Sequence, residues 1–218
     1  MKTTACVITL AVVALAVPVR GSIVSNHLIL VQNGATVLMD HFDGGTIDPM
    51  WTPVGSVGPI HDSVIDMDPG DGLLASLETQ PDQTTIASTL FQIGAPFTDG
   101  YLTLSLGGSD GSDFLALAAG DGSVALYDET GLRSLVPLAL TPTLSLTLVC
   151  LPSGGTLALA NEQVVFVGFS PVNDIASVFI GYTPIFEPAG AALLCFGLVV
   201  MAAARYAGRR GVGGGFGL

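Results

Sequence analysis

Basic side chains are scarce in this chain of 218 residues. It holds 6 lysines and arginines against 18 acidic residues, for a formal net charge of −12. Arg133 is the only lysine or arginine between residues 21 and 187, a range that holds all the acidic residues. Nucleic acids and anionic membrane surfaces are bound through Lys and Arg side chains that displace counterions. The composition therefore excludes both as partners of this central region.

Cysteine is almost as scarce. Cys6 and Cys195 lie in apolar runs near the two ends, which leaves Cys150 alone in the central region. No disulfide can form within that region, even in an oxidising compartment. Cys150 has the strand parity of Leu146 and Leu148, which predicts a small buried side chain rather than a reactive thiol.

Motifs for common chemistries are also missing. The sequence has no nucleophile elbow, no phosphate-binding loop and no closely spaced set of Cys and His residues. His27, His41 and His61 lack the spacing of metal ligands. These absences favour a protein without catalytic activity.

The N-terminus has the organisation of a secretory signal peptide. Lys2 precedes an apolar run over residues 5–17 that only Thr9 interrupts, and the small residues Ala14 and Ala16 offer a cleavage site. Cleavage near residues 21–22 is an alternative. We expect residues 1–21 to be a signal helix and the chain to be exported.

The C-terminus combines three features in a fixed order. Glu187 and Pro188 precede the uncharged residues 189–204, and a basic cluster follows, namely Arg205, Arg209 and Arg210. Sixteen residues make a helix about 24 Å long, and arginine snorkelling brings it to the thickness of a bilayer core of about 30 Å. We expect a single transmembrane helix with the arginines in the cytoplasm and the central region exported.

This order resembles a PEP-CTERM sorting signal. Phe186 stands where the first proline of the family motif would be, and the glycine-rich residues 211–218 extend past the usual end. The resemblance implies an envelope or extracellular protein, with an exosortase-type membrane protease and the export machinery as partners and the membrane helix as a transient anchor. A permanent single-span anchor is the alternative. Residues 185–210 then form the signal, and residues 22–184 the exported domain.

Residues 22–184 read as short β-strands. Residues 101–106 and 144–148 alternate apolar and polar side chains, as a half-buried strand requires. Turns rich in Gly, Asp and Ser separate such runs at residues 107–111, 120–122 and 153–155. Regular short strands with this punctuation predict an all-β, antiparallel β-sandwich or barrel.

Two stretches resemble concanavalin A-like lectin and glucanase jelly rolls. Residues 40–51 contain the run Asp-His-Phe-Asp-Gly-Gly followed by Trp51, and residues 146–166 match the hairpin of laminin-G-like domains. The resemblance implies a jelly-roll-like sandwich that binds extracellular polysaccharide. Trp51, the only tryptophan, is expected in the core rather than against a sugar.

A glucanase of that superfamily would carry Glu-x-Asp-x-x-Glu on one strand. None of the four glutamates has this spacing, and Asp128 and Glu129 are adjacent, so their side chains would point to opposite faces. We therefore expect a non-catalytic binding or structural module. A degenerate or unrecognised glycan hydrolase is the alternative.

One acidic stretch resembles a calcium loop. Asp66, Asp68 and Asp71 lie close together before Gly72, although the spacing is not that of an EF-hand. Carboxylates suit a hard cation such as Ca²⁺, and Asp and Gly are equally common in plain turns. Both interpretations stay open, with these three residues as the candidate ligands.

The terminal signals predict the mass of the mature protein. If both are processed, intact-mass spectrometry of protein from the envelope or medium should show that residues 1–21 and the residues after the Glu187-Pro188 motif are missing. A mature species that retains residues 189–218 would instead indicate a permanent anchor.

Overall fold

The computed structural model describes residues 23–184, except 44, 59, 62–63, 79–82, 94–99, 110, 121, 140, 171 and 173. The predicted signal peptide and the whole sorting signal, from Glu187 and Pro188 to the arginine cluster, lie outside these residues. Within the part that is described, no helix is long and apolar enough to cross a membrane.

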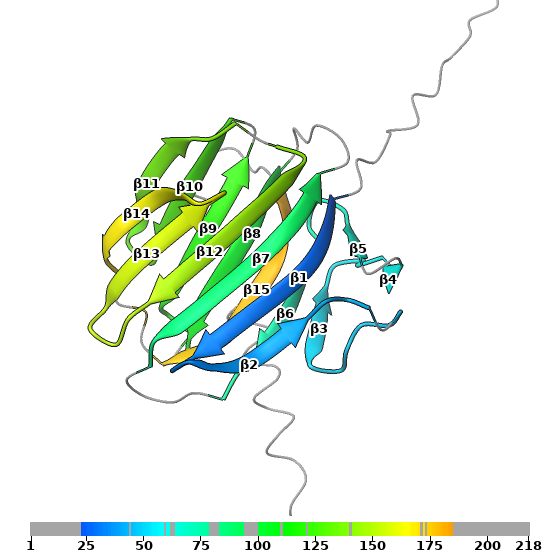
Figure 1. The fold of residues 1–218 in the computed structure, drawn as a ribbon, viewed down its shortest axis with the longest axis horizontal. Helices are drawn as coiled ribbons and strands as arrows, with labels where there is room; N and C mark the ends of the chain where they lie inside the picture. The colour runs from blue at the N-terminus through cyan, green and yellow to red at the C-terminus, as the bar shows by residue number, and fades with distance from the viewer. Residues whose placement is uncertain are drawn as a thin grey trace, which may run out of the picture.

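The described residues form two antiparallel sheets that stack as a sandwich (Figure 1). The front sheet has eight strands in the order β14 (Gln163–Phe169), β13 (Gly155–Ala160), β12 (Thr143–Cys150), β7 (Thr85–Ile93), β1 (Ile23–Gln32), β5 (Val64–Met67) and β4 (Ile60–His61), with β2 (Ala35–Asp40) also paired to β1. The back sheet has seven, in the order β11 (Gly131–Pro137), β10 (Ser123–Asp128), β9 (Phe114–Gly120), β8 (Gly100–Gly108), β15 (Ile175–Pro184), β6 (Gly72–Ser76) and β3 (Trp51–Val54). The predicted all-β antiparallel sandwich is confirmed.

The hairpin predicted in residues 146–166 is present, and the sequence explains its turns and that of the β1–β2 hairpin. Strands β12, β13 and β14 follow one another as antiparallel neighbours. Asn161 and Glu162 connect β13 to β14 with positive φ angles of 47° and 64°, and Asn33 and Gly34 connect β1 to β2 with 49° and 79°. Two-residue turns with both φ angles positive match the twist of the flanking strands, and Asn and Gly adopt them most readily.

The core between the sheets comes from the alternating leucines. Leu144, Leu146 and Leu148 of β12 are fully buried, and Cys150 on the same face is 3% exposed. Burial raises the pKa of the Cys150 thiol to about 12, so it stays protonated and unreactive. This confirms the prediction of a small buried side chain.

Trp51 also lies in the core, at 4% exposure. Its indole nitrogen donates a 2.6 Å hydrogen bond to Asp40, whose other carboxylate oxygen accepts one from the backbone N–H of Phe42. The Phe42 and Trp51 rings lie 6.3 Å apart. The acidic and aromatic residues of this stretch therefore stabilise the connection from β2 to β3, and Trp51 is not a sugar platform.

One expectation about burial is wrong. The alternation of residues 101–106 predicts a half-buried strand with its polar side in water. In β8, however, Thr103 and Ser105 are each 2% exposed, almost as fully buried as the three leucines that alternate with them. The period of two identified the strand correctly, but β8 and its neighbour β9 are buried on both faces.

Candidate functional site

The second buried surface is the face of the back sheet that points away from the core, here called the outer face. It is formed by side chains of alternate residues on adjacent strands. Across one row, Phe179 of β15 pairs with Ser105 of β8, which pairs with Ala116 of β9, which pairs with Tyr127 of β10. In the same way Tyr101, Thr103, Ala118 and Ala125 lie on this face in the neighbouring rows.

Aromatic rings on the outer face lie over glycines. A Cβ atom at Gly72 would be 2.4 Å from the Phe179 ring, and one at Gly181 would be 2.5 Å from it. The Tyr101 ring would be 2.6 Å from a Cβ at Gly120. The glycines are therefore required by packing, because the rings occupy the space that any larger side chain would take.

Two tyrosines on this face interact with each other. Tyr101 and Tyr127 are both half-buried. Burial raises the pKa of Tyr127 above its ordinary value, and the nearby phenol of Tyr101 raises it further. The Tyr127 hydroxyl therefore stays neutral and can donate a hydrogen bond at physiological pH.

Charge is absent from most of the back sheet. Strands β3, β6, β8, β9 and β15 contain no Asp, Glu, Lys, Arg or His. Leu132 and Leu135 of β11, which pair with Tyr127 and Ala125, are 55% and 60% exposed and continue the outer face to the edge of the sheet. The outer face thus combines aromatic rings, hydroxyls and small apolar side chains.

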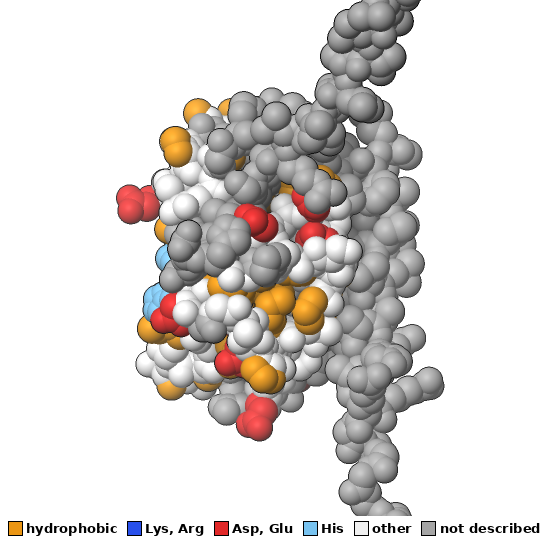
Figure 2. Space-filling view, turned by 90° about the vertical axis from the view of Figure 1, so that its right-hand side faces the viewer, with side chains coloured by type: hydrophobic (Ala, Val, Ile, Leu, Met, Phe, Trp, Pro, Cys, Tyr) orange, Lys and Arg blue, Asp and Glu red, His pale blue; other side chains and the backbone are white. Residues whose placement is uncertain are grey.

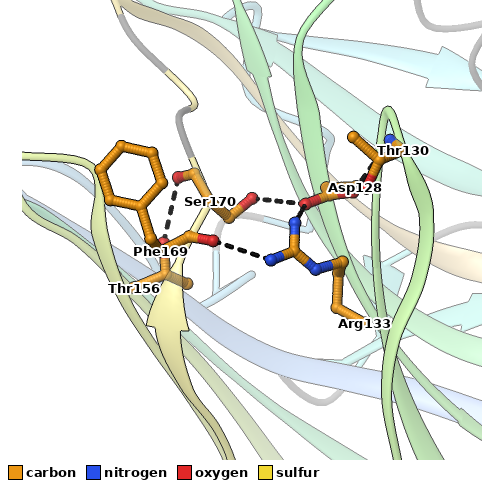
Figure 3. Close-up of polar contacts among 6 residues, drawn as sticks. All are labelled: Asp128, Thr130, Arg133, Thr156, Phe169 and Ser170. Carbon is orange, nitrogen blue, oxygen red and sulfur yellow. Dashed lines mark hydrogen bonds and ion pairs between the residues drawn. The ribbon is translucent and has the colours of Figure 1, made fainter.

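A separate polar cluster closes one edge of the sandwich (Figure 3). The Asp128 carboxylate is buried. Its Oδ1 accepts hydrogen bonds from the backbone and hydroxyl of Thr130, and its Oδ2 accepts from Arg133 Nη1 at 2.5 Å and from Ser170 at 2.9 Å. Arg133 Nη2 also donates to the backbone carbonyl of Phe169. The cluster therefore connects the β10–β11 turn to the end of β14 in the other sheet.

The cluster perturbs two neighbouring carboxyls in opposite directions. Burial alone would raise the pKa of Asp128, but the hydrogen bonds from Thr130 and Ser170 and the charge of Arg133 outweigh it and hold this pKa below its usual value. Glu129 is exposed; the loss of surrounding solvent and the charges of Asp128 and Asp113 raise its pKa. Asp128 is already fully hydrogen-bonded, so its role is structural.

A histidine pair lies at the other edge of the molecule. The rings of His27 in β1 and His41 after β2 have centroids 6.1 Å apart. Burial and the proximity of His41 both lower the pKa of His27. Figure 2, which views the sandwich from the side of β3, β4 and β5, shows acidic and histidine side chains among the described residues and no lysine or arginine.

The candidate calcium residues lie in and around the β5–β6 turn. Asp66 is in β5 and Asp68 follows it, whereas Asp71 is 5% exposed and accepts hydrogen bonds from the backbone N–H groups of Ser56 and Asp68. No group of three His, Cys, Asp or Glu side chains in the described part of the chain is arranged to hold a metal ion. Asp71 has a clear structural role, and calcium binding here stays a prediction.

Sequence reasoning identified the acidic turns but missed the outer face. The signal for it was present in Phe114–Gly120, where alanine and glycine occupy the positions that a solvated strand would fill with polar residues. Small side chains on the side opposite a leucine face indicate a second packing surface.

The similarity of this chain to known proteins is weak. No family model matches the chain, and no curated protein does. Among solved structures, a sheep galectin-11 complex with glycerol is 13% identical, with a TM-score of 0.37 over 50% of this chain and 88% of that one. A Crh5 transglycosylase in complex with NAG is 14% identical, with a TM-score of 0.43 over 76% of each chain.

A third similar structure is of botulinum neurotoxin type C, whose cell entry depends on interaction with two ganglioside molecules. It is 8% identical, with a TM-score of 0.41 over 75% of this chain, and the match spans 44% of its own length. All three similarities concern the fold and assign no ligand or activity to this chain.

The polar cluster predicts an acid-sensitive loss of stability. Asp128→Ala should lower the free energy of unfolding by about 1 to 3 kcal/mol at pH 7, because it removes the hydrogen bonds to a buried carboxylate and leaves a partly exposed arginine without its partner. Since the pKa of Asp128 is depressed on folding, its contribution is complete above the unfolded pKa of about 3.9 and is lost as the pH falls through the folded value.

Urea denaturation of wild type and variant at pH 7 and below pH 4 measures this effect, with Glu162→Gln on an exposed turn as the control. The gap between wild type and Asp128→Ala should narrow in acid. An unchanged gap would show that the carboxylate charge is not what stabilises this edge.

Calorimetry tests the calcium prediction. A bound ion stabilises the native state by mass action, so EDTA should lower the Tm and excess Ca²⁺ should restore it. Asp66→Asn and Asp68→Asn should abolish that shift, whereas Asp71→Ala should lower the Tm even in EDTA because it removes two backbone hydrogen bonds. If the wild type unfolds at the same temperature in EDTA and in Ca²⁺, these residues do not bind calcium and form a plain turn.

Proposed function

We propose that this is an exported, non-catalytic module that binds a neutral polysaccharide on the outer face of the back sheet. The observation that carries the proposal is the composition of that face: the half-buried rings of Tyr101 and Tyr127 beside small and hydroxyl side chains, without charge on β8 and β9. Sugar rings present apolar C–H faces and many hydroxyls, so flat aromatic rings and neutral hydrogen-bonding groups suit them.

Electrostatics favours a neutral glycan over an acidic one. The exported domain, residues 22–184, holds 17 of the 18 acidic residues of the chain and one arginine. That arginine is paired with Asp128 and bonded to the carbonyl of Phe169. An anionic polysaccharide would meet a domain of the same sign with no cation free to bind it.

The outer face supports binding rather than hydrolysis. Retaining and inverting glycosidases both need two carboxyls across the scissile bond. The face offers none on β8, β9 or β15. For the competing hydrolase hypothesis, Glu129 is the carboxyl to test first, because partial burial and the nearby charges of Asp128 and Asp113 raise its pKa.

The export route completes the proposal. The signal peptide and the Glu187-Pro188, apolar and arginine order support an exosortase-type protease as the processing partner and the envelope or medium as the destination. A permanent membrane anchor is the alternative for the same C-terminal segment.

Glycan binding can be measured on the mature protein with laminarin as a neutral probe and alginate as an anionic one. We expect binding to laminarin only. Tyr101→Ala and Tyr127→Ala should each weaken it about tenfold to thirtyfold, as expected for losing an aromatic anchor worth about 2 kcal/mol. Tyr127→Phe should keep most of the affinity, because it keeps the ring.

Val167→Ala, on the opposite sheet, is the matched control, since Val167 is 72% exposed. The outer face is not the binding site if the control loses as much laminarin affinity as the tyrosine variants, or if both tyrosine variants keep the affinity of the wild type. Release of reducing sugar that Glu129→Gln abolishes would establish the hydrolase instead.

A further inference from the structure

The hairpin of β1 and β2 brings two histidines together at the surface. Leu28 of β1 pairs with Asp40 of β2, and continuing this antiparallel register by one position places His27 opposite His41. Residues opposite each other in such a pair have Cβ atoms about 4.5 to 5.5 Å apart. The two imidazole rings have centroids 6.1 Å apart, and their planes are tilted by 55°. The pair is a product of the hairpin, because the spacing of the two histidines in the sequence does not indicate a metal site.

Both rings are accessible from the solvent. His41 is exposed and His27 is half-buried. Leu28 and Leu30, which alternate with His27 along β1, are fully buried in the core, so the His27 ring lies on the outer side of the front sheet. Figure 2 shows histidine side chains at the surface. Within the described part of the chain, neither imidazole has a hydrogen-bond partner, so their nitrogens can bind a ligand from the solvent.

The surroundings of the pair favour a cation. Asp40 precedes His41 in the sequence and Asp43 follows it, and acidic groups raise the local concentration of cations. Arg133, the only lysine or arginine of residues 22–184, is held in an ion pair on β11 of the other sheet. Burial and the neighbouring His41 ring lower the pKa of His27. The His27 imidazole is therefore neutral at physiological pH and keeps the nitrogen lone pair that a metal ion needs.

The separation of the rings fits two ligands of one ion. A metal about 2.0 Å from an imidazole nitrogen lies about 3.2 Å from the centroid of that ring, so two rings that share an ion have centroids at most about 6.4 Å apart. The observed 6.1 Å is within this limit. Imidazole suits Zn²⁺, Ni²⁺ and Cu²⁺, and the affinity of a nitrogen site is highest for Cu²⁺. A hard ion such as Ca²⁺ takes oxygen ligands instead.

We propose that His27 and His41 together bind a divalent transition-metal ion on the outer side of the front sheet, with Cu²⁺ bound most tightly. No third His, Cys, Asp or Glu among the described residues is arranged with them to hold an ion, so water completes the coordination. Asp40 is not a ligand, because its two oxygens already accept hydrogen bonds from Trp51 and Phe42. The bound ion would tie β1 to the end of β2. The site stands whether or not the domain binds glycan.

The only tryptophan of the chain lies close enough to report copper binding. Trp51 is hydrogen-bonded to Asp40, the residue before His41, and a bound Cu²⁺ ion quenches the fluorescence of a nearby indole. Untagged full-length protein in mild detergent is treated with EDTA, desalted and titrated with Cu²⁺. Cys6→Ser and Cys195→Ser remove the other thiols, since Cys150 is buried. We expect saturable quenching at one ion per chain, and nitrogen hyperfine splitting from two imidazoles in the electron paramagnetic resonance spectrum.

Histidine variants decide which residues hold the ion. His27→Ala and His41→Ala should each weaken Cu²⁺ binding at least tenfold, whereas Glu162→Gln, on an exposed turn, should bind as the wild type does. Circular dichroism and the Tm in EDTA show that the variants are folded, and the exposed His41 is the cleaner test. Wild-type affinity in either histidine variant, a spectrum with fewer than two nitrogens, or displacement of Cu²⁺ by excess Ca²⁺ would each overturn the proposal.

Thermal unfolding separates this site from the calcium prediction. A metal ion that binds the native state raises its Tm by mass action. Zn²⁺ should therefore raise the Tm of the wild type and of Asp66→Asn, and should leave the Tm of the His27→Ala, His41→Ala double variant unchanged. A Zn²⁺ shift that persists in the double variant would place the ion elsewhere and refute the histidine site.

Discussion

The burial of the central strands of the back sheet, β8 and β9, on both faces is the constraint on which the rest of this structure depends. An antiparallel sheet in a sandwich usually packs one face and leaves the other in water. Here leucines fill one side, and Ala, Ser, Thr and Gly fill the other beneath a few aromatic rings. The absence of charge from β8, β9 and β15 follows, because an unpaired charge on either side would be buried.

The front sheet shows the contrast. Ser145 and Thr147 of β12 are only partly buried on the side opposite the core leucines, as the alternation of the sequence predicts. A hydroxyl pair between Ser88 and Thr147 crosses from β7 to β12 on that side. Exposed Val164 and Val167 on β14 add apolar area near the edge. The two sheets therefore share one core but differ in their outer environments.

Sequence reasoning recovered what depends on local pattern. Alternating leucines predict the strands, the Gly- and Ser-rich residues 153–155 predict the turn between β12 and β13, and Trp51 and Cys150 are correctly expected in the core. It could not recover features that depend on register between distant strands. Phe179 lies beside Ser105, which is 74 residues earlier in the sequence, only because β15 pairs with β8. Likewise, nothing local indicates that Asp128 and Ser170 would meet across the two sheets.

The polar cluster explains how an acidic domain with a single arginine tolerates a buried carboxylate. The buried carboxylate of Asp128 is paired with that arginine, and it also accepts hydrogen bonds from Ser170 and Thr130. Because Arg133 is held there, it does not serve as a surface cation for an external ligand. Negative charge then dominates the loops and the end near β3, while the outer face stays neutral. The neutral glycan that we propose as the partner would therefore meet no charge on strands β8, β9 and β15.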